Sequence, residues 1–103
     1  MVDFVVAANT TDIPNGGMKT VAVGGKTIAI ANVDGQFFAI DDTCSHAQCS
    51  LGGEGFLDGT ILTCGCHGAQ FDVTNGKVFS LPAPVGVSSY KVKVEGNEIL
   101  VKL

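Results

Sequence analysis

The chain has 103 residues and a net charge of −4, with six lysines, no arginine and ten acidic residues. Its apolar content of 46% is typical of a globular protein, and its acidic balance argues against nucleic acid, whose recognition needs a basic surface. The longest early apolar run, residues 4–8, is far shorter than the roughly 20 residues that cross a bilayer. We expect one soluble domain over residues 1–103, without a membrane anchor, and a cytoplasmic location because no export signal is visible.

Short β-prone runs separated by turn signals recur along the chain, without a long helical period or an internal repeat. The first half predicts strands at residues 3–7, 19–23, 26–33 and 36–40. Gly24-Gly25 and Asp34-Gly35 predict tight turns, because glycine accepts the positive φ that such turns need. Ile28 and Ile30 lie two residues apart, so they share a face of their strand, and we expect that face to be buried.

The second half continues the pattern of strands. It predicts a small hairpin over residues 56–63 that turns at Asp58-Gly59, and a strand over residues 71–74 that turns at Asn75-Gly76 into residues 77–79. Two last strands follow at residues 88–95 and 98–103, and in the first of them Tyr90, Val92 and Val94 alternate with charged residues. Phe56 and the other phenylalanines are expected to pack in the core or under loops. The prediction is an all-β fold, an antiparallel scaffold with an insertion at about residues 41–72.

The insertion holds all four cysteines and both histidines. Cys44-Ser45-His46 and Cys64-Gly65-Cys66-His67 each offer one thiolate and one imidazole, and 17 residues, 47–63, separate them. A [2Fe–2S] cluster with two Cys and two His ligands would use both pairs. The alternatives are a structural zinc on the same four residues, ordinary disulfides, or spare thiols with solvated histidines. A cluster is favoured, since common zinc patterns pair Cys with Cys and His with His locally.

The pattern C-x-H followed by C-x-x-H resembles the signature of Rieske iron–sulfur proteins, and the resemblance covers nearly the whole chain. The first box is residues 44–49, the second is residues 64–72, and the proline segment at residues 81–84 resembles the family's loop over the cluster. The resemblance implies the Rieske fold, with a small cluster-binding subdomain, and one Rieske-type [2Fe–2S] cluster. Carried over position by position, it implies two ligands to the inner iron and two to the outer iron, namely Cys44 and Cys64, and His46 and His67.

Two cysteines are left over by this assignment. Cys49 and Cys66 match the positions of a disulfide found in one branch of the family, which includes the Rieske subunits of cytochrome bc complexes. Two free thiols in a reducing cell are the alternative. Because both positions match at once, the resemblance favours a Cys49–Cys66 disulfide.

The second box departs from the high-potential members of the family. These carry a serine and a tyrosine whose hydroxyls donate hydrogen bonds to sulfur, where this chain has Ala69 and Phe71. Such hydrogen bonds stabilise the reduced cluster and raise its potential. We therefore expect a potential in the lower part of the Rieske range of about −150 to +300 mV, as in a Rieske-type ferredoxin.

The resemblance implies a monomeric one-electron carrier between a flavin-dependent ferredoxin reductase and a terminal oxygenase that hydroxylates aromatic rings. Both partners would dock at the cluster tip, and the chain alone would catalyse no reaction. Residues 41–72 contain five acidic residues and no lysine, which suits docking onto basic surfaces or serves only solubility. The alternatives are a Rieske subunit or fragment of a larger respiratory or oxygenase complex, and a zinc-stabilised binding module.

Overall fold

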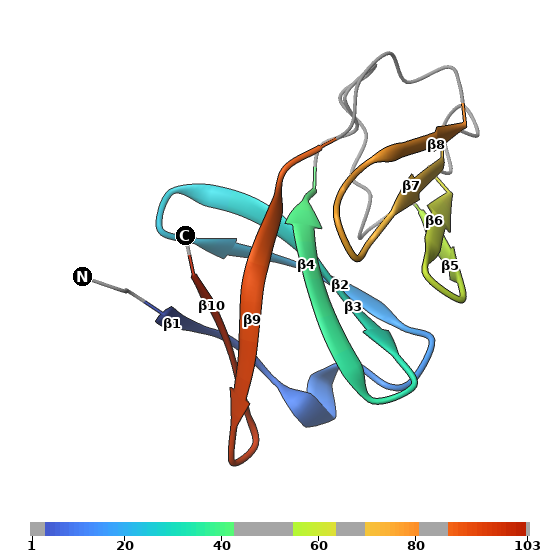
Figure 1. The fold of residues 1–103 in the computed structure, drawn as a ribbon. Coiled ribbons are helices and arrows are strands. Elements are labelled where there is room, and N and C mark those ends of the chain that lie inside the picture. The colour runs from blue at the N-terminus through green and yellow to red at the C-terminus, as the bar shows by residue number, and fades with distance from the viewer. Residues whose placement is uncertain (1–3, 43–54, 64–69, 81–86, 103) are drawn as a thin grey trace.

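The computed structural model describes residues 4–42, 55–63, 70–80 and 87–102, and within them it forms two antiparallel sheets (Figure 1). The six-stranded sheet has the order β1-β10-β9-β4-β3-β2, and the four-stranded sheet has the order β5-β6-β7-β8. The strands of the large sheet are β1 Phe4–Asn9, β2 Met18–Val23, β3 Lys26–Val33, β4 Gln36–Asp41, β9 Ser89–Glu95 and β10 Glu98–Lys102. Those of the small sheet are β5 Phe56–Asp58, β6 Ile61–Thr63, β7 Gln70–Asp72 and β8 Val78–Ser80. A 3-10 turn, η1 Thr10–Asp12, follows β1. The predicted all-β class is confirmed.

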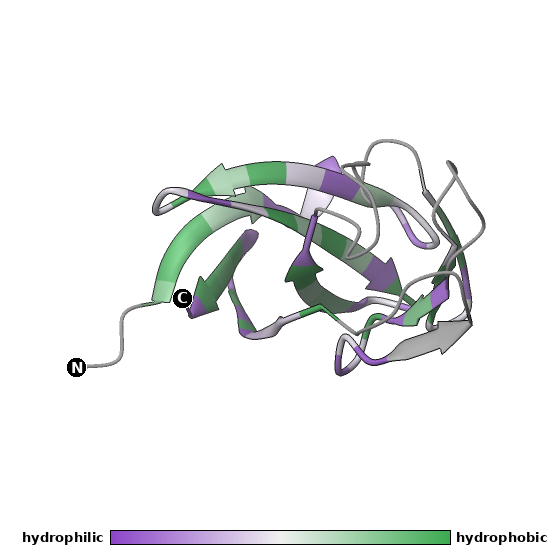
Figure 2. Cartoon of the chain, turned by 90° about the horizontal axis from the view of Figure 1, so that it is seen from above, coloured by the Kyte–Doolittle hydropathy of each residue, from purple (hydrophilic) through white to green (hydrophobic). Residues whose placement is uncertain are grey.

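The large sheet contains the hairpins β2-β3-β4 and β9-β10 and is strongly curved (Figure 2). Its two outer strands, β1 and β2, contact each other. Gly24 and Gly25 turn the chain between β2 and β3 with φ values of 56° and 79°. Asp34 and Gly35 do the same between β3 and β4, at φ values of 53° and 88°. Both predicted turns are therefore confirmed. They connect β2 to β3 and β3 to β4, and they fix the register of these strand pairs.

Strand β3 is buried on both of its faces. Ile28 and Ile30 are fully buried with Ile99 and Val101 inside the curl of the large sheet, which confirms the predicted isoleucine face. The opposite face of β3, which carries Ala29 and Ala31, is buried as well. The sequence pattern did not reveal this second burial, because alanine does not distinguish a buried face from an exposed one.

The small sheet covers the alanine face of β3. Leu62, Phe71 and Val73 are fully buried there and pack with Ala29, Ala31 and Ile40 in one apolar cluster. Alanine side chains are small, so the small sheet can approach β3 closely and still fill the space between them. This packing places the small sheet at one end of the large one, on the far side from β1 and β10 (Figure 1).

Two predicted turns of the small sheet differ from the structure. Asp58 pairs with Ile61, so the turn between β5 and β6 consists of residues 59 and 60 and not of Asp58-Gly59. Between β7 and β8 the chain makes a five-residue connection, residues 73–77, and the Asp72 N–H donates to the Lys77 carbonyl at 2.9 Å across it. The expected two-residue turn at Asn75-Gly76 is wrong, although Gly76 does have a positive φ of 77°. The Thr74 N–H donates a hydrogen bond to the Asp72 carboxylate at 2.9 Å, and this bond stabilises the longer connection.

Two expected burials are also wrong. Val94 continues the alternation of β9 but is 46% exposed, since β9 runs past β4 at this end. Phe56, expected to pack in the core or under a loop, is 61% exposed. Strand β5 is the edge of the small sheet, so an outward side chain there has a neighbouring strand on one side alone.

Within the four described ranges, no helix has the length and apolar character needed to span a membrane.

Candidate metal centre

The residues predicted to hold a metal lie outside the described residues. Cys44, His46 and Cys49 belong to residues 43–54, Cys64, Cys66, His67 and Ala69 to residues 64–69, and the proline segment to residues 81–86. The structure does describe the residues that flank these three segments. They show where each segment leaves and rejoins the two sheets.

The second ligand segment, residues 64–69, connects two paired strand ends. Thr63 ends β6 and pairs with Gln70, which begins β7. The Gln70 side-chain amide also donates to the Thr63 hydroxyl at 3.2 Å. Ser80, the last residue before the proline segment, pairs with Gln70 from the other side. Three strand ends, at residues 63, 70 and 80, therefore lie side by side where residues 64–69 and the proline segment connect to the small sheet.

The first ligand segment begins beside the end of the proline segment. The Asp41 N–H donates to the Ser88 carbonyl at 2.9 Å, and the Ser88 N–H donates to Asp41 Oδ2 at 3.2 Å. The Tyr90 hydroxyl donates to Asp41 Oδ1 at 2.5 Å. This set of bonds, the Asp41 clasp, joins the end of β4 to the start of β9, three residues before Cys44.

Asp42, the residue after the clasp, connects the end of β4 to β2 and β3. Its side chain is only 4% exposed and accepts a hydrogen bond from the Thr20 hydroxyl at 2.8 Å, while its N–H donates to the Thr27 carbonyl at 3.1 Å. A buried carboxylate needs such partners. Asp42 is therefore a structural group and not part of an exposed acidic surface, which corrects one of the five acids expected there.

A third contact fixes the end of the proline segment. The Val87 N–H donates to the Gly76 carbonyl at 2.7 Å, and a Cβ on Gly76 would overlap the Val87 carbonyl oxygen. Glycine is therefore required at residue 76 for two reasons, its positive φ and this close backbone approach. The β7–β8 connection and the start of β9 are held against each other.

These contacts place the ends of all three segments at the same end of the molecule, around the small sheet (Figure 1). Two thiolates and two imidazoles carried by such segments form a donor set that suits a mixed-ligand iron–sulfur cluster and would also suit zinc. In the part of the chain that the structure describes, no group of three or more His, Cys, Asp or Glu side chains is arranged to hold a metal ion.

The Asp41 clasp changes the pKa of its tyrosine. Burial, followed by the hydrogen bond to Asp41 and the charge of its carboxylate, raises the pKa of Tyr90 to about 12. The sequence identified Tyr90 only as a residue of a buried strand face. Its link to Asp41, which is 49 residues away in the chain, could be found only in the tertiary structure.

Comparison with known proteins gives matches over nearly the full chain. The family model for the Rieske [2Fe-2S] domain matches residues 3–91. The biphenyl dioxygenase ferredoxin subunit of Pseudomonas sp. (strain KKS102) is 38% identical over 98 residues, which cover 95% of this chain and 90% of that protein.

Two solved structures are similar as well. The ferredoxin of carbazole 1,9a-dioxygenase from Nocardioides aromaticivorans IC177 has a TM-score of 0.90 and 30% identity, and the match covers 95% of each chain. A chain in the complex of reduced oxygenase and oxidized ferredoxin in carbazole 1,9a-dioxygenase has a TM-score of 0.88 and 34% identity. That match covers 96% of this chain and 92% of the other.

The close approach at Gly76 predicts a large loss of stability in Gly76→Ala. A positive φ costs a non-glycine residue about 1–2 kcal/mol, and the collision with Val87 adds about 1–3 kcal/mol. Gly25→Ala is the matched control, since Gly25 has φ +79° but no atom near its Cβ position. Thermal unfolding should show a lower melting temperature for Gly76→Ala than for Gly25→Ala. Equal melting temperatures would mean that the contact with Val87 contributes nothing.

The Asp41 clasp predicts an unusual titration of the one tyrosine in the chain. Because its folded pKa of about 12 lies above the ordinary value of 10.0, the neutral phenol stabilises the fold. This contribution is fully present below about pH 10 and is lost as the pH rises through about 12. Tyrosinate absorbance should therefore appear near pH 12 in the native protein and near pH 10 in urea. Asp41→Asn should lower the native midpoint, and a native midpoint near 10 would contradict the described hydrogen bond.

Proposed function

The chain belongs to the Rieske [2Fe–2S] domain family, and on this basis we propose that it carries single electrons from a flavin-dependent ferredoxin reductase to a terminal oxygenase that hydroxylates aromatic rings. The expected Rieske-type [2Fe–2S] cofactor is confirmed by the family match. The observation that carries the proposal is the similarity of this chain to the ferredoxin subunit of a biphenyl dioxygenase. The matched region covers 90% of that subunit. The carbazole dioxygenase structure, in which a ferredoxin is in complex with its oxygenase, supports the second partner.

The proposed ligands are the four residues named from the sequence, with Cys44 and Cys64 on the inner iron and His46 and His67 on the outer iron. The pairing of Thr63 with Gln70, and of Asp41 with Ser88, supports this assignment because both ligand segments start at one end of the fold. When bound, the cluster supplies reversible uptake of one electron at a potential that hydrogen bonds to its sulfurs adjust.

The role proposed for the surrounding residues is to hold the ligand segments still. The Asp41 clasp and the contact between Gly76 and Val87 tie the segments to the large sheet at their bases. Phe71 and Leu62, both fully buried, fill the space between the sheets and keep water from it. Rigid support is what electron transfer needs, because ligands that move on reduction slow the exchange.

The oligomeric state, the activity of the chain alone and its cellular location are also part of the proposal. The chain acts as a monomer and converts no substrate alone, since its part in the system is to deliver electrons. The cytoplasm is the proposed location, where a flavin-dependent reductase has access to reduced nicotinamide cofactors. The Cys49–Cys66 disulfide remains a prediction, which counting the free thiols in the unreduced protein would check.

Metal analysis tests the proposed ligands directly. The purified protein should contain two irons and two labile sulfides per chain, as one [2Fe–2S] cluster requires. Cys64→Ala should lose the iron, whereas the neighbouring Cys66→Ala should retain both irons, since residue 66 is not among the proposed ligands. A colourless protein with one zinc would contradict the cofactor, and loss of iron in both variants would contradict the ligand assignment.

The reduction potential tests the interpretation of Ala69 and Phe71. Ala69→Ser together with Phe71→Tyr should raise the potential, by about 20–60 mV for each hydrogen bond that strengthens by 0.5–1.5 kcal/mol on reduction. Phe71 is fully buried, so an added hydroxyl there must find an acceptor. Protein-film voltammetry would measure the change.

Phe37→Tyr is the matched control for this potential, because Phe37 packs inside the large sheet near the start of β4. A hydroxyl there should leave the potential unchanged. An unchanged potential in the double variant would contradict the role given to the two missing hydroxyls.

A further inference from the structure

The small sheet has one buried face and one outer face. Leu57, Leu62 and Phe71 pair across β5, β6 and β7 and point into the apolar core beneath. Side chains alternate along each strand, so the residues on either side of them point outward. The outer face is therefore formed by Phe56, Asp58, Ile61, Thr63, Gln70 and Asp72.

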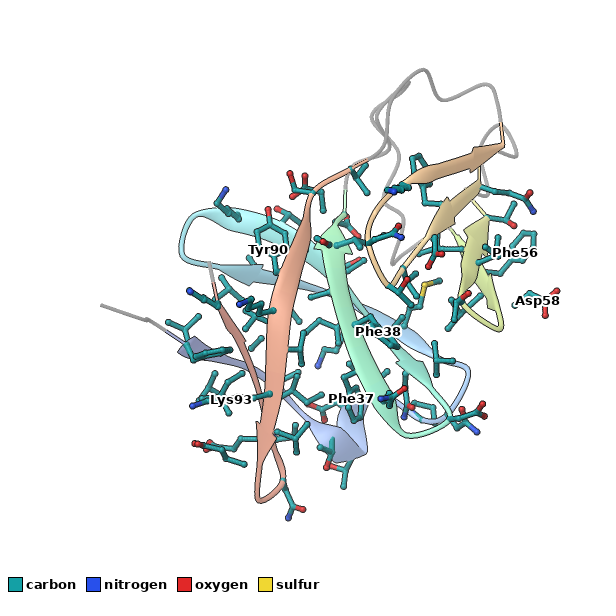
Figure 3. All side chains as sticks on the ribbon, viewed as in Figure 1. Phe37, Phe38, Phe56, Asp58, Tyr90 and Lys93 are labelled. Carbon is teal, nitrogen blue, oxygen red and sulfur yellow. The ribbon has the colours of Figure 1, made fainter. Side chains whose placement is uncertain are left out.

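Phe56 is the most prominent residue of the outer face. It is 61% exposed, and with Asp58 it points away from the rest of the molecule at the edge of the small sheet (Figure 3). The other large apolar side chains exposed in the described residues are Val6 and Val94, and both belong to the large sheet. Isolated exposed apolar residues are common, so exposure alone assigns no role to Phe56. The position of Phe56 in the small sheet and the charged residue near it do indicate a role.

The position of Phe56 is next to the proposed metal centre. Phe56 pairs with Thr63, which directly precedes Cys64, and Thr63 pairs in turn with Gln70. This row of three residues is the one nearest the point where residues 64–69 leave the sheet. A protein that covers Phe56 would therefore lie against the end of the molecule from which an electron has to leave.

The charged residue nearest to Phe56 along β5 is acidic. Asp58 and Asp72 occupy the next row of the outer face, on either side of Ile61. Residues 56–63, which form β5, β6 and their connection, contain no lysine, whereas Lys77 lies opposite Asp72, whose N–H donates to the Lys77 carbonyl at 2.9 Å. An exposed aromatic side chain with a carboxylate beside it, here Asp58, is complementary to an apolar pocket with basic residues at its edge.

We propose that the outer face of the small sheet is the docking surface for the terminal oxygenase, with Phe56 as its anchor. This inference rests on the proposed function. One electron leaves the reduced chain, which is oxidised, and the oxygenase accepts it. Reduction adds one negative charge to the chain, so an acidic face binds a basic partner more strongly in the reduced state. Stronger binding in the reduced state suits the oxygenase, because the oxygenase has to bind the reduced chain. It suits the reductase less well, because the reductase has to release the reduced chain.

The test uses the full chain with its cluster. The protein is reduced with dithionite and mixed with the oxidised terminal oxygenase of the biphenyl dioxygenase system, whose ferredoxin subunit is 38% identical to this chain. Stopped-flow absorbance gives the second-order rate of electron transfer, and calorimetry gives the Kd of the complex. Phe56→Ala should lower the rate and raise the Kd about tenfold, as for an aromatic anchor. Phe56→Leu should restore most of the loss.

Controls separate docking from damage to the protein. Val6→Ala removes an exposed apolar side chain from the large sheet, and it should leave both the rate and the Kd unchanged. The visible spectrum and reduction potential of Phe56→Ala should match those of the wild type, since an exposed side chain contributes little to the fold. Reduction of Phe56→Ala by a ferredoxin reductase should stay within about twofold of the wild-type rate.

Three results would overturn the docking proposal. These are a rate and Kd of Phe56→Ala within twofold of the wild type, an equal loss in Val6→Ala, and an equal loss with the reductase. A wild-type chain that holds its cluster but reduces no terminal oxygenase would instead overturn the proposed function, and the docking proposal with it.

Discussion

The packing of Phe71 and Leu62 against the alanine face of β3 is the interaction on which the rest of the structure depends. The small sheet is formed of three-residue strands, and strands this short are not stable alone in water. Burying a large apolar side chain contributes about 1.5–3 kcal/mol, so the few buried residues of this cluster can hold the small sheet in place. The large sheet acts as the support that gives the ligand segments a fixed base.

Polar contacts then fix the strand ends, within the large sheet and between the two sheets. Asp41 joins β4 to β9 through Ser88 and Tyr90, and the approach of Val87 to Gly76 joins β9 to the small sheet. Each contact lies at the end of a segment that bears proposed ligands or the prolines. The apolar cluster therefore sets the position of the small sheet, and the hydrogen bonds set where the segments start. Electron exchange without rearrangement needs both.

The strands of the large sheet, their turns and the family could be predicted from the sequence because each depends on local chemistry. Glycine at residues 24, 25 and 35 accepts positive φ, and alternation in β3 predicted its isoleucine face. The two Cys–His pairs indicated the Rieske family through ligand types and spacing. The exposure of Phe56 and the burial of Asp42 could not be predicted, since each depends on which strand lies next to it.

The sequence by itself thus determined the class of fold and the family, and it supplied the residues proposed to hold the cluster, because backbone preferences and ligand chemistry are properties of short segments. Only the tertiary structure decided that the small sheet would pack against the alanine residues of β3. It also decided that Asp41 would bind a tyrosine 49 residues away and that Phe56 would face solvent. These outcomes follow from how the sheets pack, and packing brings together residues whose spacing along the chain carries no signal.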